Sequence, residues 1–221
     1  PWPLPVPFGC YGQPVTELRI AANGWVSFDP TPPDYQQPLD FYNWGLPNQH
    51  GNHSIVAPFY DNLTTVVADS LAGSEFVDGV YYEHDAGAGI FRVEWSRMRH
   101  YRPEINDLQT FQLLLYDPLS HPTDSGDGEI GFMYRQVNNT DTSRGYATIG
   151  MEDHTETDGL QLSYSSVNAT GMAPIGPGLA VRLTTEAPSY ELFALDGFTT
   201  DPDEGGLALG WTCSDDRPLI A

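Results

Sequence analysis

Most of the apolar clusters between residues 16 and 183 alternate one by one with polar residues. In one segment Phe91, Val93 and Trp95 alternate with Arg92 and Glu94. A period of two is typical of a half-buried β-strand, because successive side chains lie on opposite faces of a sheet. No window of twelve or more residues has the period of an amphipathic helix. The sequence therefore predicts an all-β protein of about ten to twelve strands.

Turn residues separate these segments. Asn23-Gly24 lies between two alternating runs and predicts a tight hairpin, because both residues tolerate a positive φ angle. The continuous runs Val80–Tyr82 and Leu113–Tyr116 are expected to be buried on both faces. The strands are expected at Thr16–Ile20, Trp25–Asp29, Ser54–Phe59, Gly79–His84, Phe91–Trp95, Thr110–Tyr116, Glu129–Tyr134, Ala147–Met151, Leu160–Tyr164 and Leu179–Leu183.

This arrangement predicts a jelly-roll-like β-sandwich of mostly antiparallel strands over residues 1–185. A long loop rich in Pro, Asn, Gln and Tyr interrupts it at residues 29–53. Residues 186–221 are expected to form a C-terminal extension, with an acidic Gly/Pro linker at residues 199–206 followed by a short strand.

The chain is strongly acidic, with a formal net charge of −21, and all nine of its basic residues are arginine. Such a charge excludes a nucleic-acid binder, because nothing offsets the repulsion by phosphate. Adhesion to anionic lipid is disfavoured for the same reason. No apolar stretch is long enough to span a membrane. The acidic surface is explained either by adaptation to high salt or by an extracellular environment rich in divalent cations.

The N-terminal segment Pro1–Phe8 alternates proline with the apolar residues Trp2, Leu4, Val6 and Phe8. Proline has no backbone N–H, so one edge of such a strand offers no donors, and the segment can pair on one side only. Two roles are open: an edge strand that prevents aggregation, and an arm that inserts into a neighbouring subunit. Because the sequence starts at Pro1 without a targeting segment, it is expected to be a mature or excised piece.

Two cysteines and four sequons bear on the location of the protein. Cys10 and Cys213 form either a disulfide that closes nearly the whole chain or two separate thiols, and their spacing fits no zinc motif. The N-x-S/T sequons at Asn52, Asn62, Asn138 and Asn168 are candidate N-glycosylation sites. Together with the acidic surface, these features favour a secreted or cell-surface protein.

The predicted strands carry an ordered series of short motifs, which runs from FGCYG at Phe8–Gly12 through LRIAANGWVSF at Leu18–Phe28 and IVAPFYDNL at Ile55–Leu63 to TFQLLLYDP at Thr110–Pro118 and GDGEIGFMY at Gly126–Tyr134. The series resembles a β-sandwich module of large secreted bacterial proteins and is similar to the nidogen-type extracellular domain. The resemblance covers about residues 8–183 and implies an accessory, adhesive or structural module without a catalytic site. Cys10 departs from the family pattern, which suggests that here the N-terminus is tied to the tail through Cys213.

Three groups of residues are candidate sites. Asp124, Asp127 and Glu129 lie within six residues around two glycines, and such oxygen ligands are what Ca²⁺ prefers. Tyr35, Tyr42 and Trp44 in the long loop could form a stacking platform for sugars. Catalytic motifs such as G-x-S-x-G and HExxH are absent, so an enzyme is not expected, and no cofactor is expected besides Ca²⁺.

The sequence thus favours a non-catalytic extracellular adhesion or structural module. One version is a self-assembling surface or filament subunit joined by exchange of a terminal strand, with other protein subunits as partners. The alternative is a carbohydrate-binding module that uses the aromatic loop at residues 35–44, assisted by Ca²⁺, with surface glycans as partners.

Overall fold

The computed structural model describes residues 2–29, 42–49, 53–65, 78–102, 107–142 and 146–186. These residues form thirteen strands and no α-helix, and every strand pair is antiparallel. In chain order the strands are β1 (Trp2–Cys10), β2 (Gln13–Ala21), β3 (Trp25–Ser27), β4 (Ile55–Tyr60), β5 (Leu63–Thr64), β6 (Gly79–Asp85), β7 (Ile90–His100), β8 (Leu108–Tyr116), β9 (Ile130–Gln136), β10 (Thr148–Glu152), β11 (Gly159–Tyr164), β12 (Val167–Asn168) and β13 (Ala180–Leu183). The all-β prediction is confirmed.

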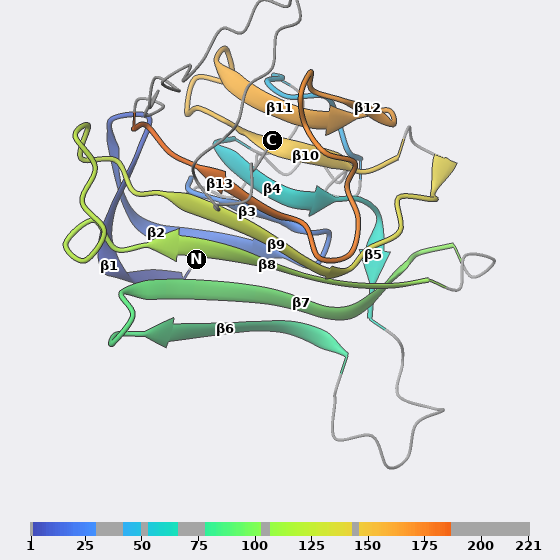
Figure 1. The fold of residues 1–221 in the computed structure, drawn as a ribbon, viewed down its shortest axis with the longest axis horizontal. Helices are drawn as coiled ribbons and strands as arrows, with labels where there is room; N and C mark the ends of the chain where they lie inside the picture. The colour runs from blue at the N-terminus through green and yellow to red at the C-terminus, as the bar shows by residue number, and fades with distance from the viewer. Residues whose placement is uncertain are drawn as a thin grey trace, which may run out of the picture. The chain divides into compact units, whose positions relative to one another are not determined.

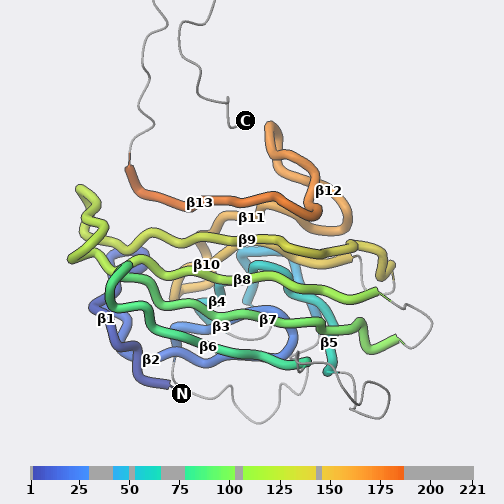
Figure 2. The backbone as a smooth tube through the Cα atoms, turned by 60° about the horizontal axis from the view of Figure 1, so that its bottom comes forward, coloured from blue at the N-terminus to red at the C-terminus, as the bar shows by residue number. Residues whose placement is uncertain are grey.

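The strands form two sheets that pack face to face as a sandwich (Figures 1 and 2). The first sheet has seven strands in the order β1-β2-β3-β4-β10-β11-β12. The second has six, in the order β13-β9-β8-β7-β5, with β6 paired to β7. The chain crosses from the first sheet to the second after β4, returns at β10 and crosses again before β13, and the predicted sandwich architecture is confirmed.

Inward-facing side chains of both sheets form the core. Trp95 and Phe111 stack with ring centroids 5.1 Å apart, and both side chains are completely buried. The polar ends of two core aromatics bond to the backbone of the opposite sheet, as such groups do when buried. The Trp95 indole donates to the carbonyl of Ala21 at 2.8 Å, and the Tyr134 hydroxyl donates to the carbonyl of Pro58 at 2.6 Å.

The predicted hairpin at Asn23-Gly24 is confirmed, since β2 pairs with β3 through Ala21 and Trp25. Gly24 has a φ angle of +82°, and a Cβ atom there would lie 1.8 Å from the carbonyl oxygen of Phe59. The turn therefore packs directly on β4 and needs glycine for two reasons. Its neighbour Asn23 accepts the backbone N–H of Asp61 at 3.1 Å, which fixes the chain where β4 ends.

The proline-rich segment forms β1, an edge strand of the seven-stranded sheet. Leu4, Val6 and Phe8 are buried in the core of their own chain, whereas Trp2 is 49% exposed and contacts Tyr82 with ring centroids 5.1 Å apart. The structure agrees with the edge-strand interpretation. Exchange of this arm between subunits stays a prediction.

One burial prediction is wrong. The run Val80–Tyr82 was expected to be buried on both faces, but it lies in β6, an edge strand, with Tyr81 45% and Tyr82 51% exposed. The matching prediction for Leu113–Tyr116 is right for Leu113, Leu114 and Leu115, since β8 lies between β7 and β9.

Some predictions fall where the structure describes little. Of the long loop, residues 30–41 and 50–52 lie outside the described residues, and residues 42–49 form neither strand nor helix. The C-terminal extension beyond residue 186 also lies outside, including Cys213, so the disulfide with the buried Cys10 and the domain boundary stay predictions. Among the described residues no helix is long and apolar enough to cross a membrane.

Candidate functional site

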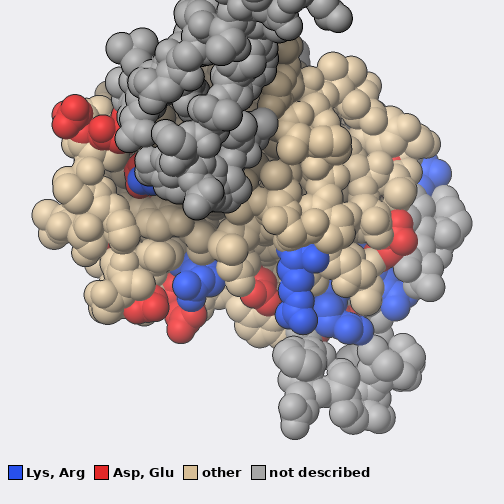
Figure 3. All heavy atoms as spheres, in the orientation of Figure 1, with Lys and Arg blue, Asp and Glu red and all other residues tan. Residues whose placement is uncertain are grey.

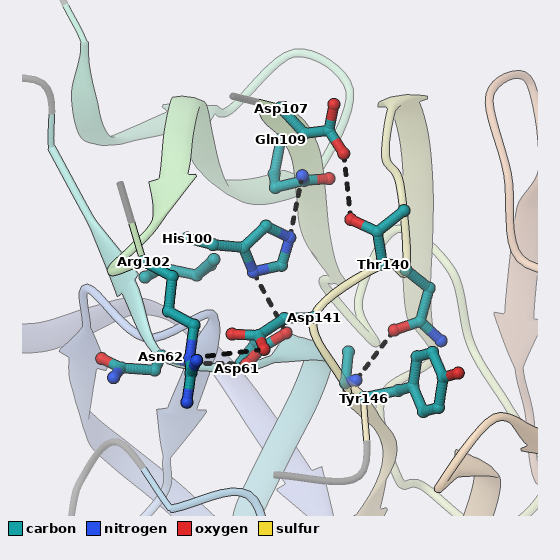
Figure 4. Close-up of polar contacts among 12 residues, drawn as sticks. Asp61, Asn62, His100, Arg102, Asp107, Gln109, Thr140, Asp141 and Tyr146 are labelled. Atoms are coloured by element: carbon teal, nitrogen blue, oxygen red, sulfur yellow. Dashed lines mark hydrogen bonds and ion pairs between the residues drawn. The ribbon is translucent and has the colours of Figure 1, made fainter. Parts of the chain in front are cut away.

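Three buried ionisable residues meet near the ends of strands from both sheets. Asp61, His100 and Asp141 are only 1%, 2% and 3% exposed. One nitrogen or oxygen atom from each side chain lies within 4.8 Å of the others. Figure 4 shows the His100 ring between Gln109 on one side and the two carboxylates on the other. We call these three residues the Asp–His–Asp cluster.

The cluster is assembled from three distant parts of the chain. Asp61 directly follows β4, where the Asn23 carbonyl accepts its backbone N–H, and its Oδ1 accepts the N–H of Asn62 at 2.7 Å. Asp141 lies in the connection between β9 and β10, where its carbonyl accepts the N–H of Tyr146 at 3.1 Å. The backbone bonds fix the main chain at both aspartates, and the bond from Asn62 holds one carboxylate oxygen of Asp61.

His100 faces inward because of a β-bulge. The pairing of β7 with β8 shifts register between Trp95 and Met98, and Arg97 adopts a φ angle of 55° there. An extra residue in one strand reverses which side chains face the core. Before the bulge the odd-numbered residues of β7 are buried, and after it Met98 and His100 are.

The two nitrogens of His100 have different surroundings. Nε2 lies 3.1 Å from the Gln109 amide nitrogen and 3.4 Å from the Asn138 carbonyl oxygen. Gln109 is held by the N–H of Asn138, which donates to its Oε1 at 2.7 Å. Nδ1 lies 3.3 Å from Asp61 Oδ2, yet neither atom has a hydrogen-bond partner of ordinary geometry within the described chain.

Charges around the cluster are close to balance. Burial lowers the pKa of His100, but Asp61, the Asn138 carbonyl and Asp141 raise it, and the net shift is upward. Arg102 Nε lies 4.0 Å from Asp141 Oδ1. The two carboxylates can therefore be neutralised by Arg102 together with a protonated His100, or by a bound divalent cation alone.

The residues predicted to bind Ca²⁺ are not brought together. The Asp127 carboxylate accepts the N–H of Gly12 at 3.0 Å, and Glu129 is ion-paired with Arg182, whose guanidinium donates at 2.6 Å. Asp124 donates its backbone N–H to Glu186 at 2.7 Å. Among the described residues, the group with the geometry of metal ligands is the Asp–His–Asp cluster instead. Binding of Ca²⁺ at residues 124–129 stays a prediction.

The aromatic loop and the sequons are partly described. Tyr42 and Trp44 stack on each other with centroids 5.9 Å apart and an angle of 24° between the rings, while Tyr35 lies outside the described residues. Sugar binding by this loop stays a prediction. Asn138 is exposed, Asn62 and Asn168 are half-buried, and Asn52 lies outside the described residues.

The outward face of the six-stranded sheet differs from the acidic average of the chain. Five of the nine arginines come from β7, β9 and β13, namely Arg92, Arg97, Arg99, Arg135 and Arg182. Figure 3 shows blue and red side chains next to each other along the lower part of the molecule, where β6 and β7 run. Arg92 pairs with Glu83 at 2.7 Å, and Tyr81 and Met133 line a shallow groove beside them.

The free edges of the two sheets are not equivalent. β1 carries prolines at positions 3, 5 and 7, and the other terminal strands β5, β12 and β13 have two to four residues. β6 has seven residues without proline, all paired with β7 on one side. No other described strand pairs with its outer edge. Natural sheets usually protect long edges, so this one is a candidate contact surface.

Comparison with known proteins identifies a protein family. The model of a protein family described as "NIDO related" matches residues 1–183, which covers every described strand. No curated protein and no solved structure matches the chain.

Proposed function

Since the chain belongs to the NIDO-related family, which indicates an extracellular domain of structural or adhesion type that interacts with proteins, we propose that it is a non-catalytic adhesion module that self-associates through β6. The observation that carries this proposal is the long, proline-free outer edge of β6. An extended strand can add to such an edge through main-chain hydrogen bonds. The partner strand we propose is β6 of a second copy.

The sequence of β6 is complementary to itself. In an antiparallel pair centred on Tyr82, Tyr81 lies opposite Glu83 of the other copy, and Val80 lies opposite His84. No two like charges face each other in this register, whereas a pair centred on Glu83 would oppose two glutamates. Residues that lie opposite each other in an antiparallel pair point to the same face of the sheet. The core-facing sides of the six-stranded sheets of both copies would therefore lie on the same side of the joined sheet. A two-fold axis through Tyr82 would produce one continuous sheet.

The Asp–His–Asp cluster supports a non-catalytic role. Its three side chains are at most 3% exposed, so they offer a substrate no surface. The alternative carbohydrate-binding function receives less support, because Tyr42 and Trp44 stack on each other and each ring gives one face to its neighbour. Assembly through the N-terminal arm is likewise less favoured than assembly through β6, because its apolar residues are buried in their own chain.

The test is self-association of the 221-residue chain, measured by sedimentation velocity over a range of concentrations. Tyr81→Asp would oppose Asp to Glu83 twice in the symmetric pair. At about 0.2–1 kcal/mol for each like-charge contact, the dimer should weaken about 2- to 30-fold. Tyr81→Arg should strengthen it, because Arg would face the same glutamate.

Met133→Asp is the matched control, since Met133 is also 45% exposed on the same face but lies in β9, away from the edge. It should leave association unchanged. Circular dichroism checks that all variants remain folded. A wild-type chain that stays monomeric at high concentration, or equal effects of Tyr81→Asp and Met133→Asp, would overturn the proposal.

A further inference from the structure

We propose that the Asp–His–Asp cluster binds one divalent transition-metal ion, with Asp61, His100 through Nδ1, and Asp141 as the protein ligands. One imidazole and two carboxylates form a donor set suited to Zn²⁺, Mn²⁺ or Fe²⁺. Ca²⁺ fits less well, because it takes six to eight oxygen ligands and the cluster offers a nitrogen in place of one of them.

The geometry of two ligand atoms supports a bound ion. Two ligands each about 2.1 Å from a tetrahedral ion lie about 3.4 Å apart. His100 Nδ1 and Asp61 Oδ2 are 3.3 Å apart, close enough for an ion pair, but the contact lacks the geometry of a hydrogen bond, and neither buried atom has a further hydrogen-bond partner among the described residues. Buried polar atoms are rarely left unpaired, because each unpaired atom keeps the full cost of its desolvation. A shared ion satisfies both atoms at once.

The surroundings of the ligands provide the outer contacts that metal sites use. A ligating histidine usually donates its other N–H to a carbonyl or carboxylate, which fixes the ring. The Asn138 carbonyl lies 3.4 Å from His100 Nε2 and can accept that proton. Gln109 also faces Nε2, so in the metal-free state its amide can donate there while Nδ1 carries the proton toward Asp61. The Asn138 carbonyl thus suits the metal-bound ring, whose Nε2 is a donor, whereas the Gln109 amide suits only the metal-free ring, whose Nε2 is an acceptor.

A proton competes with the metal for Nδ1. Without metal, a protonated His100 can balance one carboxylate, and a divalent ion must displace that proton to bind. Metal affinity should therefore rise with pH, with release of about one proton for each ion bound. The titratable and charged groups facing His100 are Asp61 from the first sheet and Asp141 from the β9–β10 connection, with Arg102 beside Asp141.

An ion in this position would link the two sheets. Asp61 follows β4 of the seven-stranded sheet, and His100 ends β7 of the six-stranded sheet. Asp141 adds the connection that returns the chain from the second sheet to the first. The ion would act as an internal cross-link, and it does not require the proposed self-association.

The experiment uses the complete 221-residue chain, stripped with a chelator and titrated with ZnCl₂ by calorimetry at several pH values. The expected result is one Zn²⁺ per chain, affinity that rises with pH, and a higher melting temperature of the loaded protein. Both His100→Gln and Asp141→Asn should weaken binding by at least about 100-fold. His121→Gln is the control, since His121 is a half-buried histidine whose Nε2 lies 2.8 Å from the Ala88 carbonyl oxygen, away from the cluster.

If the cluster variants fail to fold, X-ray absorption at the zinc edge of the loaded wild-type chain replaces them. One imidazole with oxygen ligands at the ion supports the proposal. The proposal is overturned if the wild-type chain binds no Zn²⁺, Mn²⁺ or Fe²⁺ at about 1 mM, or if absorption shows oxygen ligands only. Unchanged affinity in a folded His100→Gln variant would equally overturn it, and the cluster would then be a buried ion pair.

Discussion

A buried glutamate allows a direct test of how burial in this fold shifts the pKa of a carboxyl group. Glu152, the last residue of β10, is 1% exposed. Its Oε2 accepts the backbone N–H of Asn48 at 3.0 Å, whereas its Oε1 has no partner within the described chain. Burial raises the pKa of Glu152, the Asn48 bond lowers it, and Glu156 and Asp153 raise it, so that the pKa lies at about 8. The folded chain therefore keeps this carboxyl protonated through neutral pH.

The sign of the effect follows from proton binding. Between the ordinary value of 4.5 and about 8, the unfolded chain has lost this proton while the folded chain still holds it. The free energy of unfolding must then fall as pH rises through this window. The full difference corresponds to about 5 kcal/mol, which is an upper limit because water entry and side-chain movement reduce it.

The perturbation is Glu152→Gln, which stays neutral at every pH and keeps an oxygen for Asn48. The variant should match the wild type near pH 4 and exceed its stability by several kcal/mol at pH 8. Urea unfolding followed by tryptophan fluorescence from pH 4 to 9 measures the difference. Equal pH dependence in the two proteins would refute the reasoning.

Glu129→Gln is the opposite control for that experiment. Burial raises the pKa of Glu129, but Arg182 and Thr184 lower it more, so the net shift is downward. The stability from this ionised group is present above the unfolded pKa and is lost as pH falls through the folded pKa. Glu129→Gln should therefore destabilise the chain at pH 7, where Glu152→Gln stabilises it.

Three further changes test other parts of the fold. Gly24→Ala should lower the free energy of unfolding by more than about 3 kcal/mol in urea unfolding, because the new Cβ would overlap a carbonyl oxygen of β4 and the residue has a positive φ angle. A loss below about 1 kcal/mol would contradict this packing. Tyr134→Phe should cost about 1–3 kcal/mol, because it leaves the Pro58 carbonyl buried without its donor, and an unchanged unfolding midpoint would argue against that bond. Replacing Pro3 and Pro5 together by Thr should increase aggregation in light scattering without loss of strand content, because it returns donors to the β1 edge; unchanged scattering would mean that the prolines do not protect it.

Local pattern was sufficient where local geometry decides the structure. The alternation of Phe91, Val93 and Trp95 predicted the buried face of β7, and Asn23-Gly24 predicted the hairpin. Both features depend on a few consecutive residues, and the residue types at these positions predict which face is buried and where a positive φ angle occurs. The prediction stops at the bulge after Trp95, because one extra residue reverses the faces and brings His100 into the core.

Edge position and long-range contacts could not be predicted in the same way. The run Val80–Tyr82 reads as a buried strand, but sheet order places it at an edge, where Tyr82 contacts Trp2. Apolar content does not distinguish a central strand from an edge strand whose aromatics cover the rim of the core.

The candidate metal sites show the same limit. Asp124, Asp127 and Glu129 are close in sequence; Asp127 accepts the N–H of Gly12, Glu129 pairs with Arg182, and Ca²⁺ binding by these residues stays a prediction. The Asp–His–Asp cluster instead joins residues 61, 100 and 141, and no local spacing connects them. The segment IVAPFYDNL at Ile55–Leu63 contains Asp61, but the role of Asp61 depends on partners far away in the chain.

The proposed self-association surface and the proposed metal site both involve β7, so it can be tested whether they are independent. The first part of β7, Ile90–Ser96, pairs with β6, and its last residue, beyond the bulge, is His100. Because the bulge interrupts the ladder between these parts, removal of the metal should loosen the far end of β7 and leave the β6 edge unchanged. Sedimentation of the Zn²⁺-loaded and chelator-treated chain should then give the same association constant. Association that disappears with the chelator would show that the bulge does not separate the two halves of this strand.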